Sequence, residues 1–90
     1  MQLYRGDVNE IRIFAMKGVK MRFDKSTLAR TIKSKRALRG WNQTELAMRS
    51  GVSLSTVSAY EAESIDKPAF TNVVKIAESL DASLDEFVAT

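Results

Sequence analysis

The chain has 90 residues, 44% of them hydrophobic and 28% charged, which fits one domain and excludes a two-domain enzyme. It contains no cysteine and no histidine, so the usual zinc ligands, thiol nucleophiles, disulfides and the commonest general base are absent. We therefore expect a protein that is not an enzyme and that uses no metal and no cofactor. No apolar stretch approaches ~18 residues, which predicts neither a membrane span nor a secretory signal and favours a cytoplasmic location.

The net charge of +3 is too small to identify a partner, but the charges are unevenly distributed along the chain. Residues 1–23 carry five basic and two acidic side chains, residues 24–50 carry seven and two, and residues 51–90 carry two and seven. A basic half joined to an acidic half favours nucleic acid as the partner of the basic half. A solvated, charged helix is the alternative interpretation.

Residues 1–23 are predicted to form an N-terminal arm with a short β-hairpin that turns at Lys17-Gly18. Apolar side chains alternate with polar ones around this turn and would give one apolar face, made of Phe14, Met16, Val19, Met21 and Phe23. An isolated two-stranded hairpin is marginal in water. This face therefore needs the helical core, a second copy of the chain or another protein as its partner. A disordered extension is the alternative.

Three helices are predicted between residue 24 and residue 61. Each follows a side chain that can cap a helix N-terminus, namely Asp24, Asn42 or Ser53. Gly40 and Gly51 follow the first and second helices, where a left-handed residue often ends a helix. The second helix is only about two turns long, with a capping-box pattern at its start. These signals predict three short helices joined by tight connections.

Two further helices complete the prediction for residues 24–90. The fourth spans roughly Phe70 to Leu80, where apolar residues recur at helical spacing after Lys67-Pro68. Ser83 and Glu86 have capping-box spacing ahead of a short fifth helix that contains Leu84, Phe87 and Val88. The expected fold class is therefore all-α, with five helices following the N-terminal hairpin arm.

The second and third helices have the features of a helix-turn-helix. Ala47 supplies a small side chain where two helices cross steeply, and Gly51 supplies a residue that tolerates positive φ in the turn. Val57 and Tyr60 supply apolar anchors behind the third helix. An arbitrary pair of antiparallel helices seldom satisfies all of these requirements together.

This segment resembles the Xre family of helix-turn-helix regulators, which includes the Cro and lambdoid phage repressor DNA-binding domains. The resemblance covers about residues 24–90 and rests on Arg36, Gln43, Glu45, Leu46, Ala47, Gly51, Val52, Ser53, Thr56, Val57, Tyr60, Glu61, Pro68, Ile76, Ala77 and Leu80. It implies that the helix starting at Leu54 lies in the major groove. It also implies a homodimer that binds a pseudo-palindromic operator on double-stranded DNA.

The family motif places five residues of the recognition helix at base edges: Leu54, Ser55, Thr56, Ser58 and Ala59. Related repressors commonly have glutamines at two of these positions, where this chain has Leu54 and Ala59. Leucine and alanine can only touch a thymine methyl, whereas serine and threonine form single hydrogen bonds to several bases or to phosphate. We therefore expect weak discrimination between bases by this helix, with part of any specificity coming from the shape of the DNA or from basic residues outside the helix.

Phosphate contacts are expected from helix N-termini and from basic side chains. Gln43 matches the family glutamine that holds a phosphate and braces the recognition helix. The expected set is Asn42, Gln43, Thr44, Lys35, Arg39, Arg49, Ser53 and Lys67. The loop before Pro68, often basic in related repressors, contains only Lys67 as a basic residue, which weakens one of the usual phosphate contacts.

Arg36 and Glu61 both fall on inward-facing stripes, four residues after Ile32 and Val57 respectively. A lone buried charge is very costly, so two opposite charges at inward positions predict an ion pair between the first and third helices. The family resemblance includes such a pair. Trp41 is expected to anchor the junction of the first two helices, with base stacking as the alternative.

Three functional hypotheses follow. The first is a sequence-specific DNA-binding regulator, in its simplest form a dimeric repressor. The second is an antitoxin that represses its own operon and binds a toxin through the N-terminal arm. The third is a protein-interaction module whose motif has lost contact with DNA, which the acidic loop and the missing glutamines allow.

Overall fold

The computed structural model describes residues 23–88, and the predicted hairpin lies outside them apart from Phe23. The described part contains four α-helices and one 3-10 turn, with no strand. The elements are α2 (Lys25–Leu38), α3 (Gln43–Ser50), α4 (Leu54–Glu61), α5 (Phe70–Ser79) and η1 (Leu84–Phe87). The predicted all-α class is therefore confirmed for these residues. None of these helices is long and apolar enough to cross a membrane.

Local capping defines where the helices start. The side chains of Asp24, Asn42 and Ser53 accept hydrogen bonds from the backbone N–H three residues later, at 2.9, 2.8 and 3.2 Å. Each bond satisfies one of the N–H groups that have no partner within the helix. Gly40 and Gly51 have φ values of +71° and +77°, as expected for residues that end a helix in the left-handed conformation. The three predicted N-caps and both glycine positions are confirmed.

The prediction of a fifth α-helix is wrong, because residues 84–87 form a single 3-10 turn. The predicted capping box of Ser83 and Glu86 is present, but Val88 is already extended, with φ −108° and ψ 152°. Residues three apart lie on the same side of a 3-10 helix. One such turn therefore buries Leu84 and Phe87 together, at 1% and 0% exposure, and no longer helix is needed.

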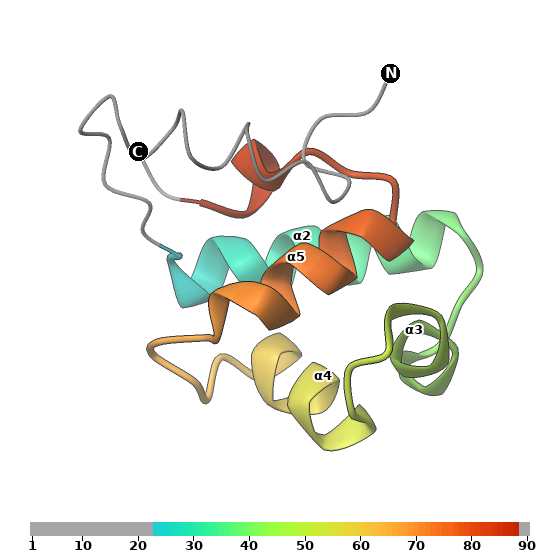
Figure 1. Ribbon diagram of the computed structural model, residues 1–90, viewed down its shortest axis with the longest axis horizontal. Coiled ribbons are helices and arrows are strands. Elements are labelled where there is room, and N and C mark those ends of the chain that lie inside the picture. Colours follow the sequence, from blue (N-terminus) through green and yellow to red (C-terminus); the bar gives the residue numbers. More distant parts are fainter. Residues whose placement is uncertain (1–22, 89–90) are drawn as a thin grey trace.

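The core lies where the helices meet, and its largest fully buried side chains are Phe87, Leu28, Ile32, Leu46, Ile76, Leu80, Leu84, Val57 and Val73. All of the described elements contribute to this cluster, so the fold depends on tertiary packing between short helices. Phe23, which the sequence assigned to the hairpin face, stacks on Phe70 of α5 at 5.9 Å between ring centroids. Figure 1 shows α4 on one side of the α2–α5 pair and η1 on the other.

Candidate nucleic-acid interface

The connection from α3 to α4 has the geometry expected of a helix-turn-helix. α3 ends at Ser50, and the N–H of its C-cap residue, Gly51, donates to the carbonyl of Ala47 at 3.0 Å. Val52 then turns into the core and is 4% exposed, and Ser53 caps α4. Three residues therefore separate the two helices, and the one with positive φ is the glycine that the sequence indicated.

The face of α4 that is open to solvent carries the five residues expected at base edges. Leu54 and Ser55 are exposed, whereas Thr56, Ser58 and Ala59 are half-buried. The opposite face of α4 is fixed in the core through Val57, Tyr60 and Glu61, each at most 5% exposed. The helix therefore presents short side chains outward from a firmly packed backbone.

Arg36 and Glu61 form a two-pronged ion pair between α2 and α4. Arg36 Nε donates to Glu61 Oε2 at 2.8 Å, and Arg36 Nη2 donates to Glu61 Oε1 at 2.9 Å. The Glu61 side chain is 4% exposed and that of Arg36 is 20% exposed. Arg36 Nη1 also donates to the carbonyl of Trp41 at 2.9 Å, which ties the α2–α3 junction to the pair. The hydrogen bond to Glu61 raises the pKa of Arg36, so this guanidinium stays charged.

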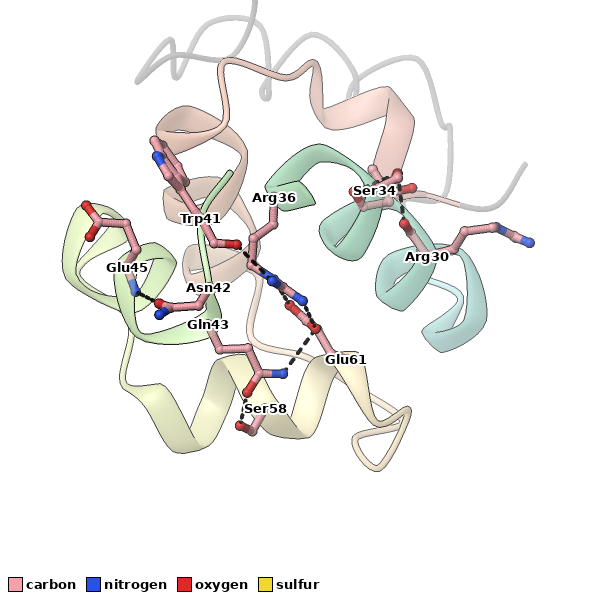
Figure 2. Close-up of polar contacts among 10 residues, drawn as sticks. Arg30, Ser34, Arg36, Trp41, Asn42, Gln43, Glu45, Ser58 and Glu61 are labelled. Carbon is pink, nitrogen blue, oxygen red and sulfur yellow. Dashed lines mark hydrogen bonds and ion pairs between the residues drawn. The ribbon is translucent and has the colours of Figure 1, made fainter. Parts of the chain in front are cut away.

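Gln43 of α3 forms hydrogen bonds to two side chains of α4, Glu61 and Ser58, as Figure 2 shows. Its Nε2 donates to Glu61 Oε1 at 3.0 Å, and its Oε1 accepts from Ser58 Oγ at 2.7 Å. The family resemblance implied that Gln43 holds a phosphate and braces the recognition helix, but it assigned Ser58 to a base edge and did not indicate that Gln43 and Ser58 touch. The two residues are 15 positions apart on different helices, so no spacing rule links them. Only the crossing angle of α3 and α4 brings them together.

The expected phosphate-binding cations occupy different places. Lys35 lies 2.7 Å from Glu86 of η1, on the side of α2 away from α4. Arg39 donates to the carbonyl of Leu80 at 2.7 Å. Lys67 is exposed in the loop after α4. The structure therefore does not gather Lys35 with the residues of the α3–α4 face.

Trp41 lies within cation–π distance of two guanidinium groups. The Arg39 group is 5.3 Å from the centre of the indole ring, and the Arg49 group is 4.5 Å from it. Arg49 also contacts the carboxylate of Glu45, one turn earlier on α3, at 2.6 Å. The ring is half-buried and packs against the core, which matches the anchoring role expected for Trp41.

The remaining phosphate candidates lie at helix N-termini. Asn42 and Ser53 use a side-chain oxygen as the N-cap of α3 and α4 respectively. Thr44, in the first turn of α3, is exposed. Each cap satisfies only one of the first-turn N–H groups, and such groups at a helix N-terminus are in general suited to a phosphate oxygen.

The loop after α4 is less acidic in effect than its sequence indicates. Asp66 forms an ion pair at 2.9 Å with Lys25, at the start of α2. The hydrogen bond lowers the pKa of Asp66 and raises that of Lys25. A shallow groove of about 420 Å³ runs between α2 and this loop and includes Arg30 and Lys33 in its lining. Neither cation belongs to the phosphate-binding set predicted from the sequence.

Comparison with protein-family models decides the family. The model of the helix-turn-helix family matches residues 32–87, which is more than half of the chain. The chain belongs to the Xre type of the helix-turn-helix family. It is therefore a DNA-binding transcriptional regulator. No curated protein and no solved structure matches the chain significantly.

Proposed function

We propose that this Xre-type regulator is a dimeric repressor that reads the major groove with α4. The observation that supports the proposal best is the pairing of an open outer face on α4 with a rigid inner attachment. Val57, Tyr60 and Glu61 fix the helix in the core, while Leu54 and Ser55 stand exposed at its N-terminal end. A helix held in this way can present base-reading side chains without a cost in ordering on binding.

Two polar contacts near α4, the Lys25–Asp66 ion pair and the Gln43 amide, favour DNA over a protein partner for this face. α4 itself contains no basic residue, so positive charge must come from neighbouring segments and would position the protein without reading sequence. The ion pair of Lys25 with Asp66 offsets one of the acidic groups in the loop that favoured the protein-interaction hypothesis. Gln43 keeps one amide hydrogen beyond the one given to Glu61, and this hydrogen suits a phosphate oxygen.

A gel shift with the promoter region of the protein's own gene, at several salt concentrations, tests this proposal. If 4–6 phosphates are neutralised per dimer, the log–log slope of affinity against salt should be about −4 to −5. Lys67→Gln should weaken binding to all sequences and reduce the slope by about two units, since each protomer of the dimer loses one phosphate contact. Lys75→Gln, which removes the same charge from α5, is the matched control and should leave the slope unchanged. A flat salt response of the unaltered protein would contradict the proposal.

The antitoxin hypothesis differs in its partner and is separable by experiment. It assigns the partner-binding role to the N-terminal arm, which lies outside the described residues except for Phe23. Under this hypothesis a small basic protein co-purifies with the full chain and is lost when residues 1–22 are deleted. Sizing of the same deletion variant tests whether the arm also supplies the dimer contact.

A further inference from the structure

The hydrogen bonds that run from Arg36 to Ser58 have a fixed direction. A guanidinium can only donate, and each Glu61 oxygen accepts one of its N–H groups, at 2.8 and 2.9 Å. The carboxylate therefore offers only acceptors to any further neighbour. Because Glu61 is 5% exposed, water cannot easily reverse this arrangement.

The carboxylate determines which way round the Gln43 amide lies. One end of that amide is 3.0 Å from Glu61 Oε1, and only the NH₂ end can donate there. The oxygen end must then face Ser58, whose Oγ is 2.7 Å away. An amide oxygen only accepts, so Ser58 has to give its single hydroxyl hydrogen to Gln43.

Ser58 is thereby left with lone pairs alone for any outside partner. Its neighbour Thr56 is different, because the Thr56 oxygen accepts from Ser53 at 2.8 Å and its own hydrogen is not used within residues 23–88. The hydroxyls of Thr56 and Ser58 therefore differ in what they can offer to DNA. Thr56 can donate to DNA, whereas Ser58 can only accept.

We infer that Ser58 acts as a hydrogen-bond acceptor in the major groove and selects the exocyclic amino group of adenine or cytosine on the strand that it faces. This inference rests on the proposed function. In the major groove adenine N6 and cytosine N4 are donors, while guanine O6 and thymine O4 are acceptors. A phosphate oxygen is also an acceptor, so the same polarity turns Ser58 away from the DNA backbone. Guanine or thymine at this position would set two acceptors against each other.

Selection from a library of duplexes with a random centre, followed by titration of the four bases at each selected position, tests the inference. At one position per half-site the full-length protein should bind adenine or cytosine about fivefold to tenfold more tightly than guanine or thymine. Ser58→Ala should abolish this preference while leaving preferences at the other positions intact. Ser55→Ala, the matched control on the same helix, should leave the preference at the Ser58 position unchanged.

Gln43→Met tests whether the preference comes from the hydrogen bond that Ser58 donates to Gln43, whose amide is oriented by Glu61. Methionine has about the same length but no amide oxygen, so the Ser58 hydroxyl becomes free to donate as well as to accept. The ratio of affinities at the Ser58 position should then fall to about twofold or less. The loss of a phosphate contact in this variant would weaken all sequences equally and would not change that ratio. Circular dichroism melts of both variants verify that each is folded at the assay temperature.

These outcomes distinguish a failure of the proposed function from a failure of the Ser58 inference. If the unaltered protein selects no sequence and shows a flat salt response, the proposed function fails, and this inference fails with it. If it selects a sequence but no adenine-or-cytosine position responds to Ser58→Ala, the inference alone is overturned. If Gln43→Met is folded and keeps the full preference, the hydrogen bonds from Glu61 through Gln43 do not make Ser58 an acceptor, and that part of the inference is overturned.

Discussion

Replacement of Arg36 by methionine should destabilise the fold more than the loss of any other ion pair in residues 23–88, because the Arg36–Glu61 pair is the most buried of them. Methionine can occupy the space of the arginine stem but provides none of its three donors. Glu61, which is 5% exposed, would keep a hydrogen bond from Gln43 alone, and the carbonyl of Trp41 would lose its donor. The variant therefore leaves a carboxylate buried without a counter-charge.

The expected loss follows from that burial. Removal of one partner of a buried ion pair costs about 3–5 kcal/mol, because the other charge stays in the interior. For a domain of this size, each kcal/mol lowers the midpoint of thermal unfolding by about 4–8 °C. The midpoint should therefore fall by at least about 12 °C. Total stabilities of ~5–15 kcal/mol are usual, so Arg36→Met approaches the limit of a folded protein.

Urea titrations followed by circular dichroism measure this loss and separate its causes. Arg36→Met and Glu61→Leu are compared singly and together. The double variant has no buried charge and should recover about 2 kcal/mol or more of the loss, since apolar replacements of buried pairs are often tolerated. Recovery should be incomplete, because the Trp41 carbonyl still lacks its donor. A loss of less than about 1 kcal/mol in Arg36→Met alone would show that Glu61 is not left buried without a counter-charge.

Three further predictions concern the turn, the start of α4 and the packing of η1. Gly51→Ala should cost about 1 kcal/mol, because a Cβ there meets nothing within 4 Å and only the positive φ of 77° is strained; a loss above about 3 kcal/mol in urea would contradict this. Ser53→Ala should cost about 1 kcal/mol through the lost cap, whereas Ser53→Asp should keep stability but weaken DNA binding in a gel shift; equal binding by Ser53→Asp and the unaltered protein would count against α4 facing DNA. Lys35 holds the pKa of Glu86 below its usual value, so this pair stabilises the fold fully above the ordinary carboxyl pKa, and the benefit is lost as the pH falls through the lowered pKa. In melts, Glu86→Gln should therefore be less stable at pH 7 by less than ~1 kcal/mol, since both side chains are partly exposed, and the difference should shrink as the pH falls through the lowered pKa of Glu86; a difference that grew towards low pH would contradict this.

Local sequence signals predicted the features that depend on neighbouring residues. These signals correctly predicted the N-caps at Asp24, Asn42 and Ser53 and the left-handed glycines at 40 and 51. A cap hydrogen bond joins residues only three apart, and the φ angle depends on a single residue, so neither needs the tertiary structure. The same signals predicted a fifth α-helix at residues 84–87. They failed there because a capping box starts a 3-10 turn as well as it starts an α-helix, and burial of Leu84 and Phe87 decided between them.

The inward positions of Arg36 and Glu61 followed from helical periodicity, but their bond geometry did not. The partners of the cations could not be predicted either. Lys35 contacts Glu86 of η1, 51 residues away, and Arg39 contacts the end of α5. A long basic side chain can reach several acceptors, and the packing angles of the helices decide which acceptor lies near enough.

The residue pattern alone predicted the helix-turn-helix, because small, glycine and apolar residues at fixed spacing leave few other arrangements for two short helices. The resemblance to the Xre family then implied a DNA-binding regulator. The tertiary structure alone brought Gln43 between Glu61 and Ser58. A hydrogen bond tolerates only a few tenths of an ångström in the distance between its donor and acceptor atoms. The crossing of α3 over α4 therefore had to be known before the direction of the Gln43–Ser58 hydrogen bond could be derived. That crossing is also what makes Ser58 an acceptor in the inference drawn above.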